Sequence, residues 1–138
     1  MALWNPFYKD VSRRDEILFG GFQEEKYCGG IRRFEGLSAS KLRQLVEEGF
    51  ADPEDKQNYA PTLMEFLRFA EEHTHVTFSG YAVHPEREDY RVSVDGMEMI
   101  TMDVREASDA INFLRGADEF DSEFQPDGLT ATISAWWD

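Results

Sequence analysis

The hydrophobic and polar positions of this chain follow two periods, one typical of helices and one typical of strands. In three segments the apolar residues recur at intervals of three and four, which places them on one face of an α-helix. Five other segments are short and rich in β-branched and aromatic residues, as strands are. The segments predicted to hold helices, with their capping residues included, are 37–50, 62–73 and 103–116. The predicted strands are residues 26–35, 75–84, 90–94, 97–101 and 129–137.

Each predicted helix begins after a residue that caps helix N-termini well. Ser38 precedes the first helix, and Asp103 precedes the third. Thr62 and Glu65 have the spacing of a capping box, in which each side chain accepts a hydrogen bond from the other residue's backbone N–H. The caps therefore locate the start of each helix.

Asp95 and Gly96 separate the strands predicted at 90–94 and 97–101. An Asp-Gly pair accepts the positive φ angles of a tight two-residue turn, so the pattern predicts a β-hairpin at this point. With the strand at 75–84 as an antiparallel neighbour, a meander of three strands results.

The C-terminal strand alternates strictly between apolar and polar residues. Trp137 falls with Leu, Ala and Ile on one face, and Trp136 falls with Thr and Ser on the other. We therefore expect a half-buried strand. An indole on its polar face would be a natural anchor for an interface, or would be covered by a second layer of the fold.

The order of the elements predicts an α+β fold, with a mainly antiparallel sheet of about five strands and three helices packed on one face. The length of 138 residues suits one domain with one core, so we expect a single domain over residues 1–138. Residues 1–25 contain Trp4, Pro6, Phe7 and Tyr8 and are expected to form an aromatic N-terminal arm or an edge element.

The composition agrees with a folded protein, because 41% of the residues are hydrophobic and 14% are aromatic. No secretory leader or membrane-spanning stretch is evident, so a cytoplasmic location is expected. The single cysteine, Cys28, excludes an intramolecular disulfide and is expected to be a buried or half-buried structural residue.

The net charge of −14 is segregated along the chain. Residues 1–50 hold eight basic and eight acidic side chains, whereas residues 51–138 hold six basic and twenty acidic ones. Such a surface repels nucleic acids and anionic membranes and attracts a basic partner. The simpler interpretation is that the excess of acid keeps the protein in solution.

Residues 117–128 concentrate five acidic side chains just before the last strand. An EF-hand register that starts at Asp118 or at Asp121 places unsuitable residues at the required ligand and glycine positions. The segment is therefore expected to be a hydrated helix-to-strand connection, with Phe120 and Phe124 packed beneath it. No cofactor or metal is expected, and the oligomeric state stays open.

These patterns favour a non-enzymatic interaction module that binds a basic surface on a partner protein. In its most specific form the partner is a nucleic-acid-binding protein or nuclease, and the carboxylates mimic phosphates. The candidate partner-binding residues are Asp118, Glu119, Asp121, Glu123, Asp127 and Trp136. One alternative is a metal-assisted hydrolase that uses carboxylates with His75 or His84. Another is an assembly protein that associates through its Trp-bearing last strand.

Overall fold

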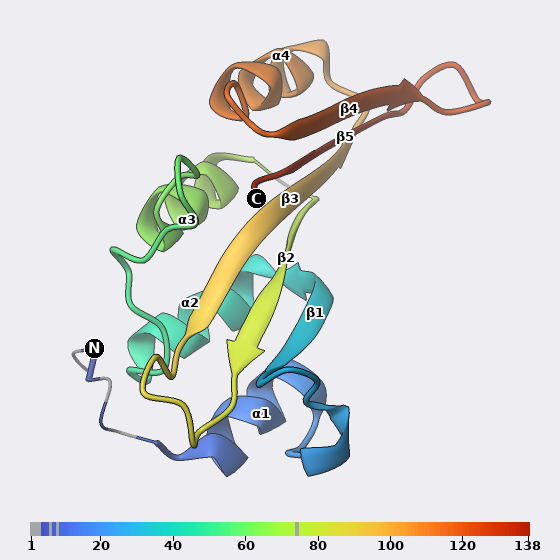
Figure 1. Ribbon diagram of the computed structural model, residues 1–138. Coiled ribbons are helices and arrows are strands. Elements are labelled where there is room, and N and C mark those ends of the chain that lie inside the picture. The colour runs from blue at the N-terminus through green and yellow to red at the C-terminus, as the bar shows by residue number, and fades with distance from the viewer. Residues whose placement is uncertain (1–3, 6, 8, 74) are drawn as a thin grey trace.

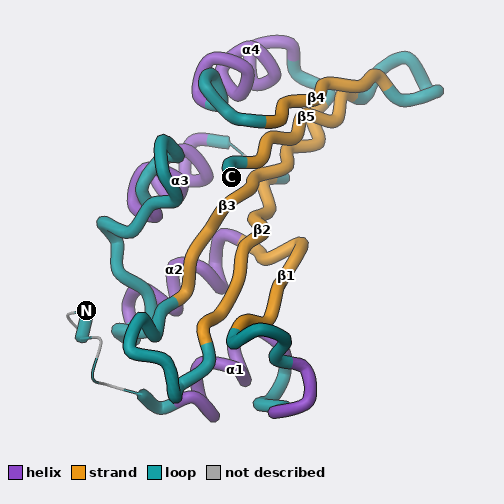
Figure 2. Tube along the Cα trace, in the orientation of Figure 1, coloured by secondary structure: helices purple, strands orange, loops and turns teal. Residues whose placement is uncertain are grey.

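The structure, a computed structural model, describes every residue except 1–3, 6, 8 and 74 (Figure 1). Its described residues form four α-helices, one 3₁₀ helix and five strands (Figure 2). The helices are α1 (Val11–Phe19), α2 (Ala39–Glu47), α3 (Leu63–Glu72), α4 (Val104–Phe113) and the 3₁₀ helix η1 (Glu24–Lys26). The strands are β1 (Ile31–Ser38), β2 (Val76–Val83), β3 (Val92–Thr101), β4 (Glu119–Phe124) and β5 (Ala131–Trp136).

All five strands belong to one antiparallel sheet in the order β1-β2-β3-β5-β4. The predicted α+β class and five-stranded antiparallel sheet are confirmed. The predicted number of helices is wrong, because the described residues form four α-helices rather than three. The last strand of the chain, β5, lies between β3 and β4, so β1 and β4 are the edges of the sheet.

The hairpin predicted at Asp95-Gly96 is also wrong, because β3 runs through both residues without a turn. They form a β-bulge: Ser79 pairs with Gly96 and Gly80 pairs with Val94. Asp95 is therefore an extra residue in β3 that has no partner in β2. A Cβ at Gly96 would lie 2.3 Å from the Ser79 Oγ, so close packing rather than a turn requires glycine there. The Asp95 carboxylate accepts two hydrogen bonds from Arg33, at 3.0 and 3.1 Å.

The predicted helix starts are confirmed. The Ser38 and Asp103 side chains each accept a hydrogen bond from a backbone N–H in the first turn of α2 and α4. Thr62 and Glu65 form the complete capping box of α3, with both hydrogen bonds at 3.1 Å. Because Ser38 is also the last residue of β1, the chain passes from strand to helix without a loop.

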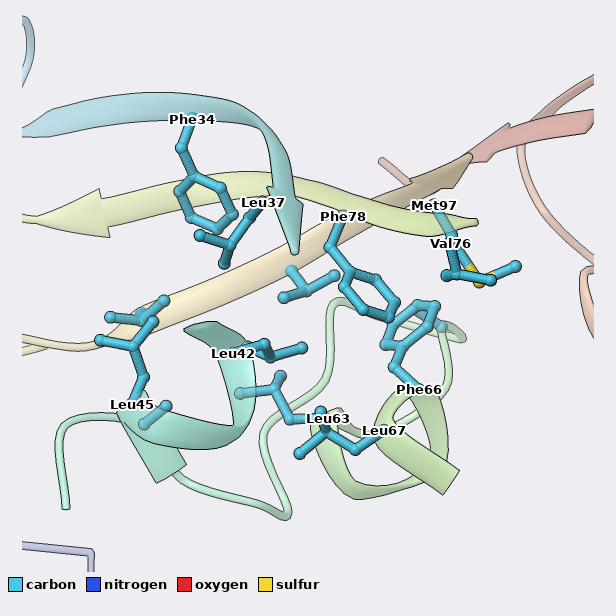
Figure 3. Close-up of a cluster of buried hydrophobic side chains, with 14 of the residues drawn as sticks. Phe34, Leu37, Leu42, Leu45, Leu63, Phe66, Leu67, Val76, Phe78 and Met97 are labelled. Atoms are coloured by element: carbon cyan, nitrogen blue, oxygen red, sulfur yellow. The ribbon is translucent and has the colours of Figure 1, made fainter. Parts of the chain in front are cut away.

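The core lies between one face of the sheet and the helices (Figure 3). Phe34, Phe78 and Met97 point from neighbouring strands toward Leu42 of α2 and Phe66 of α3. All of these side chains are at most 5% exposed, and burial of this apolar surface is the main favourable contribution to folding.

Strand residues that alternate with the core positions project from the opposite face of the sheet, which we call the open face. Its residues are exposed or half buried and mostly polar. It carries Glu35, Thr77, Ser79, Glu98, Glu119, Asp121, Glu123, Thr132, Ser134 and Trp136.

Helix α1 falls in the segment that was expected to be an aromatic arm or an edge element, and no helix was predicted there. Four consecutive charged residues, 13–16, interrupt its apolar pattern and hide the helical period. The residues at its two ends are typical of a helix. Asp10 caps the N-terminus, and Gly20 ends the helix in the left-handed conformation, with φ of 83°.

The aromatic residues before α1 give a mixed picture. Trp4 is half buried, whereas Phe7 is 88% exposed. The expectations for Pro6 and Tyr8 lie outside the described residues. Cys28, expected to be buried or half buried, is exposed.

Two charged residues of α1, Arg14 and Asp15, are completely buried. The Arg14 guanidinium donates to the Asp15 carboxylate at 2.8 Å, to the carbonyl oxygen of Val83 at 2.8 Å and to the Tyr27 hydroxyl at 2.7 Å. It also lies over the ring of Tyr90, 4.5 Å from the centroid. The hydrogen bonds and the ion pair together compensate for the loss of hydration of both charges.

Tyr27 completes this buried cluster. Its hydroxyl donates to the Asp15 carboxylate, and burial together with this hydrogen bond raises the pKa of Tyr27 above its usual range. His84 packs edge-on against the Tyr27 ring and bonds to Glu24 of η1 at 2.8 Å. The cluster thereby attaches α1 and η1 to the end of β2.

Replacement of Arg14 by Ala is expected to lower the free energy of unfolding by about 3–5 kcal/mol, because Asp15 would stay buried without its partner. Urea denaturation followed by circular dichroism measures the change. The control is Arg43→Ala, which removes the exposed Arg43–Glu71 pair and should cost less than about 1 kcal/mol. Equal losses in the two variants would contradict the role assigned to Arg14.

Candidate functional site

The acidic segment predicted to be a connection is in fact largely a strand, β4, which pairs antiparallel with β5. Phe120 and Phe124, expected to pack beneath a loop, are 43% and 78% exposed. The strands predicted at 90–94 and 97–101 form the single strand β3, and β4 was not predicted. The predicted count of five strands is therefore right, although the strands themselves differ. The turn between β4 and β5 extends away from the helices in Figure 2.

The register of β4 and β5 decides where the acidic side chains point. Glu119 lies opposite Trp136, and Asp121 lies opposite Ser134. Directly opposite residues of an antiparallel pair share a face of the sheet, so both carboxylates project from the open face. Glu123 does the same one step further along β4.

A cavity of about 720 Å³ lies on the open face. It brings together Glu119, Asp121 and Trp136 with two acidic residues from other strands, Glu35 of β1 and Glu98 of β3. The remaining lining combines Gly36, Thr77, Ser79 and Ser134 with the apolar residues Phe78, Met97, Phe120 and Ala135. We call the residues Glu35, Glu98, Glu119, Asp121 and Trp136 the acidic cavity.

Two β-bulges shape the floor of this cavity. In β1, Glu35 and Gly36 together lie opposite the single residue Ser79, and in β3 the extra residue Asp95 precedes Gly96, which pairs with Ser79. Bulges increase the local twist of a sheet, and glycine and serine add little side-chain volume. The open face is therefore hollow at the level of Ser79.

The carboxylates of the acidic cavity are not neutralised by nearby bases. Among the described residues, Glu35, Glu98, Glu119 and Asp121 take part in no hydrogen bond or ion pair through their side chains. Arg33 lies on the same side of the sheet, but its guanidinium is engaged by Asp95. Four negative charges thus surround one concave surface.

Sequence reasoning missed Glu35 and Glu98, although both lie in or next to predicted strands. A strand pattern shows that Glu98 alternates with the buried Met97 and Met99, and so predicts an outward side chain. It does not show which strands are neighbours, and only the order β1-β2-β3-β5-β4 brings these carboxylates to one cavity.

The two tryptophans behave as their alternation predicts. Trp137 is 2% exposed and packs edge-on against Phe66 in the core, with ring centroids 5.8 Å apart. Trp136 is half buried and lines the acidic cavity. A partly exposed indole beside carboxylates offers an apolar surface to the aliphatic stem of a basic side chain.

Asp118 and Asp127, also candidate binding residues, do not line the acidic cavity, and their carboxylates accept local hydrogen bonds. The Asp118 carboxylate accepts a hydrogen bond from the backbone N–H of Asp138 at 2.7 Å. Asp127 accepts from the backbone N–H groups of Leu129 and Thr130 and from the Thr130 hydroxyl, at 2.8 to 2.9 Å. These bonds lower the pKa of Asp127 and fold the turn between β4 and β5.

His75 and His84, the histidines of the alternative hydrolase, do not line the acidic cavity, and neither does His73. His84 bonds to Glu24 near α1, and His73 lies between α3 and α4, 3.7 Å from Asp109. His75 borders a second hollow of about 960 Å³ at the start of α4. Within the described part of the chain, no three His, Cys, Asp or Glu residues lie close enough together to hold a metal ion.

Comparisons of the chain with protein-family models, with curated proteins and with solved structures found no match. No helix in the described ranges has the length and apolar character needed to cross a bilayer.

The role of Asp127 in the turn gives a prediction about pH. Its folded-state pKa lies below 3.8, so the ionised carboxylate stabilises the fold above this pH, and the contribution is lost as the pH falls through the folded-state pKa. The variant Asp127→Ala should therefore be less stable than the native chain at pH 7, and the difference should shrink below pH 3.8.

Thermal unfolding of both proteins from pH 7 to pH 2.5 measures this difference. Glu123→Gln is the control, because Glu123 lies in the same hairpin but makes no hydrogen bond among the described residues. A difference for Asp127→Ala that is independent of pH would show that the carboxylate charge does not hold the turn.

Proposed function

We propose that the protein is a non-enzymatic interaction module, and that its open face binds a basic surface of a partner protein. The observation that supports the proposal is the acidic cavity itself. Four carboxylates from three different strands converge there, without bases from the described residues to neutralise them. A basic partner would relieve their mutual repulsion and gain electrostatic attraction.

The shape of the surface supports a more specific form of the proposal. Glu119, Asp121 and Glu123 project from β4 at intervals of two residues, or roughly 7 Å. A nucleic acid strand likewise presents negative charges in a regular line, and its binding proteins are built to neutralise them. In this form of the proposal the partner is a nucleic-acid-binding protein, whose binding site the open face occupies.

Trp136 gives the surface an element that a purely electrostatic contact lacks. Indoles are frequent at the centres of protein interfaces, where they exclude water from neighbouring polar contacts. Because Trp136 lies opposite Glu119, the indole and the carboxylate can contact the same basic side chain. The alternative of an assembly protein also relied on Trp136 in the last strand. In this proposal the same residue belongs to the surface that binds the basic partner.

The experiment compares two variants that each remove three negative charges. One carries Glu98→Gln, Glu119→Gln and Asp121→Asn in the acidic cavity. The other carries Glu47→Gln, Glu54→Gln and Glu72→Gln, which are exposed and lie outside the sheet. Calorimetric titration with a decalysine peptide at low salt measures the affinity of each protein.

The cavity variant should bind about tenfold more weakly than the native protein, because each exposed charge pair contributes about 0.2–1 kcal/mol. The control variant should change the affinity by less than about threefold. Equal losses would mean that net charge alone attracts the peptide, and the proposal would fail. Capture from a cell lysate by the native protein and by the cavity variant then identifies the natural partner.

A further inference from the structure

The outer edge of β4 is open to another strand. β4 ends the sheet on one side, and among the described residues it pairs only with β5. Its six residues are all exposed (Figure 1 shows β4 and β5 beside α4). An edge of this kind presents backbone N–H and C=O groups that an extended segment can bind.

The hydrogen-bond pattern shows which backbone groups face this edge. The N–H of Gln125 donates to the carbonyl oxygen of Thr130 at 2.8 Å, directly beyond the last β4 pair. Bonded and non-bonded pairs alternate in an antiparallel ladder, so the bonded residues of β4 are 119, 121 and 123. The N–H and C=O groups of Phe120, Ser122 and Phe124 consequently point outward.

The side chains of β4 also divide into two sets. Glu119, Asp121 and Glu123 lie on the open face, whereas Phe120 and Phe124 lie on the opposite face and expose their rings. A strand added to this edge would place its side chains alternately beside the carboxylates and beside the phenyl rings.

We propose that β4 receives an extended segment of the basic partner as a sixth strand, in which Lys or Arg residues alternate with apolar residues. The proposal rests on the proposed function, because it takes the partner to be basic, and it adds how the partner binds. Backbone hydrogen bonds to Phe120, Ser122 and Phe124 hold the segment, and its two sets of side chains meet complementary sets on β4.

A second copy of this chain is a poor occupant of the same edge. If two β4 strands paired antiparallel around Ser122, Asp121 of each copy would lie opposite Glu123 of the other. Like charges directly opposite each other destabilise a sheet. The carboxylates therefore oppose self-association and favour a basic strand.

The first experiment titrates the native protein with two peptides of identical composition. In one, four lysines alternate with four valines, and in the other the lysines and valines form two blocks. Only the alternating peptide can present lysine to one face of β4 and valine to the other, so we expect it to bind about tenfold more tightly. Equal affinities would overturn strand addition but leave the acidic surface intact. Failure of both peptides to bind would overturn both proposals.

The second experiment uses Ser122→Pro, with Ser122→Ala as its control. Proline removes an N–H that points to the free edge and is tolerated on edge strands for that reason. The proline variant should lose the preference for the alternating peptide, whereas the alanine variant should keep it. A preference retained by a folded proline variant contradicts strand addition.

A direct readout does not depend on any variant. Hydrogen exchange of the native protein, followed by NMR, should show slower exchange for the amides of Phe120, Ser122 and Phe124 when the alternating peptide is bound, by about tenfold or more. Unchanged exchange at these three amides in the complex would overturn the proposal, whatever the affinity.

Discussion

The open face depends on the pairing of β5 with two neighbours at once. β5 bonds to β3 on one side and to β4 on the other, while Ile133 and Trp137 are buried in the core. A slip of one residue would expose Trp137 and bury the polar set, so core burial determines which residues of β5 point outward. With that register fixed, Glu119 and Asp121 must share a face with Trp136. Hydrophobic burial on one side of the sheet thus positions the charges on the other.

Two irregularities of the sheet turn a row of charges into a concave surface. Both bulges lie opposite Ser79, and each inserts an acidic residue next to a glycine, at Glu35-Gly36 and at Asp95-Gly96. The two carboxylates have different surroundings. Asp95 pairs with Arg33, whereas Glu35 lines the cavity. An acidic excess that served only solubility would require no such hollow, since scattered surface carboxylates keep a protein in solution equally well.

Features that depend on a few neighbouring residues, such as helix caps, could be predicted from the sequence. Features that depend on contacts between distant segments could not. Ser38, Thr62 and Asp103 cap their helices because a cap needs only a side chain and the next turn of backbone. Asp95-Gly96 suits a tight turn locally, but pairing with β2 and β5 on both sides keeps β3 extended there. In α1, burial of Arg14 depends on partners in β2 and in the segment after η1, which no helical period reveals. Three of the six candidate binding residues reach the acidic cavity, but the order of strands that joins them to other acids could not be predicted.

The composition of β4 distinguishes protection of an edge from recognition. Charged side chains alone are enough to prevent unwanted pairing at a sheet edge, and the three carboxylates of β4 meet that need. Phe120 and Phe124 work against it, because exposed aromatic rings on an edge strand promote association. In the proposed strand addition, the carboxylates of β4 repel an acidic segment, and a wholly apolar segment leaves them without a partner. The proposed partner segment offers bases to one face and apolar groups to the other, so its specificity would arise from attraction and repulsion together.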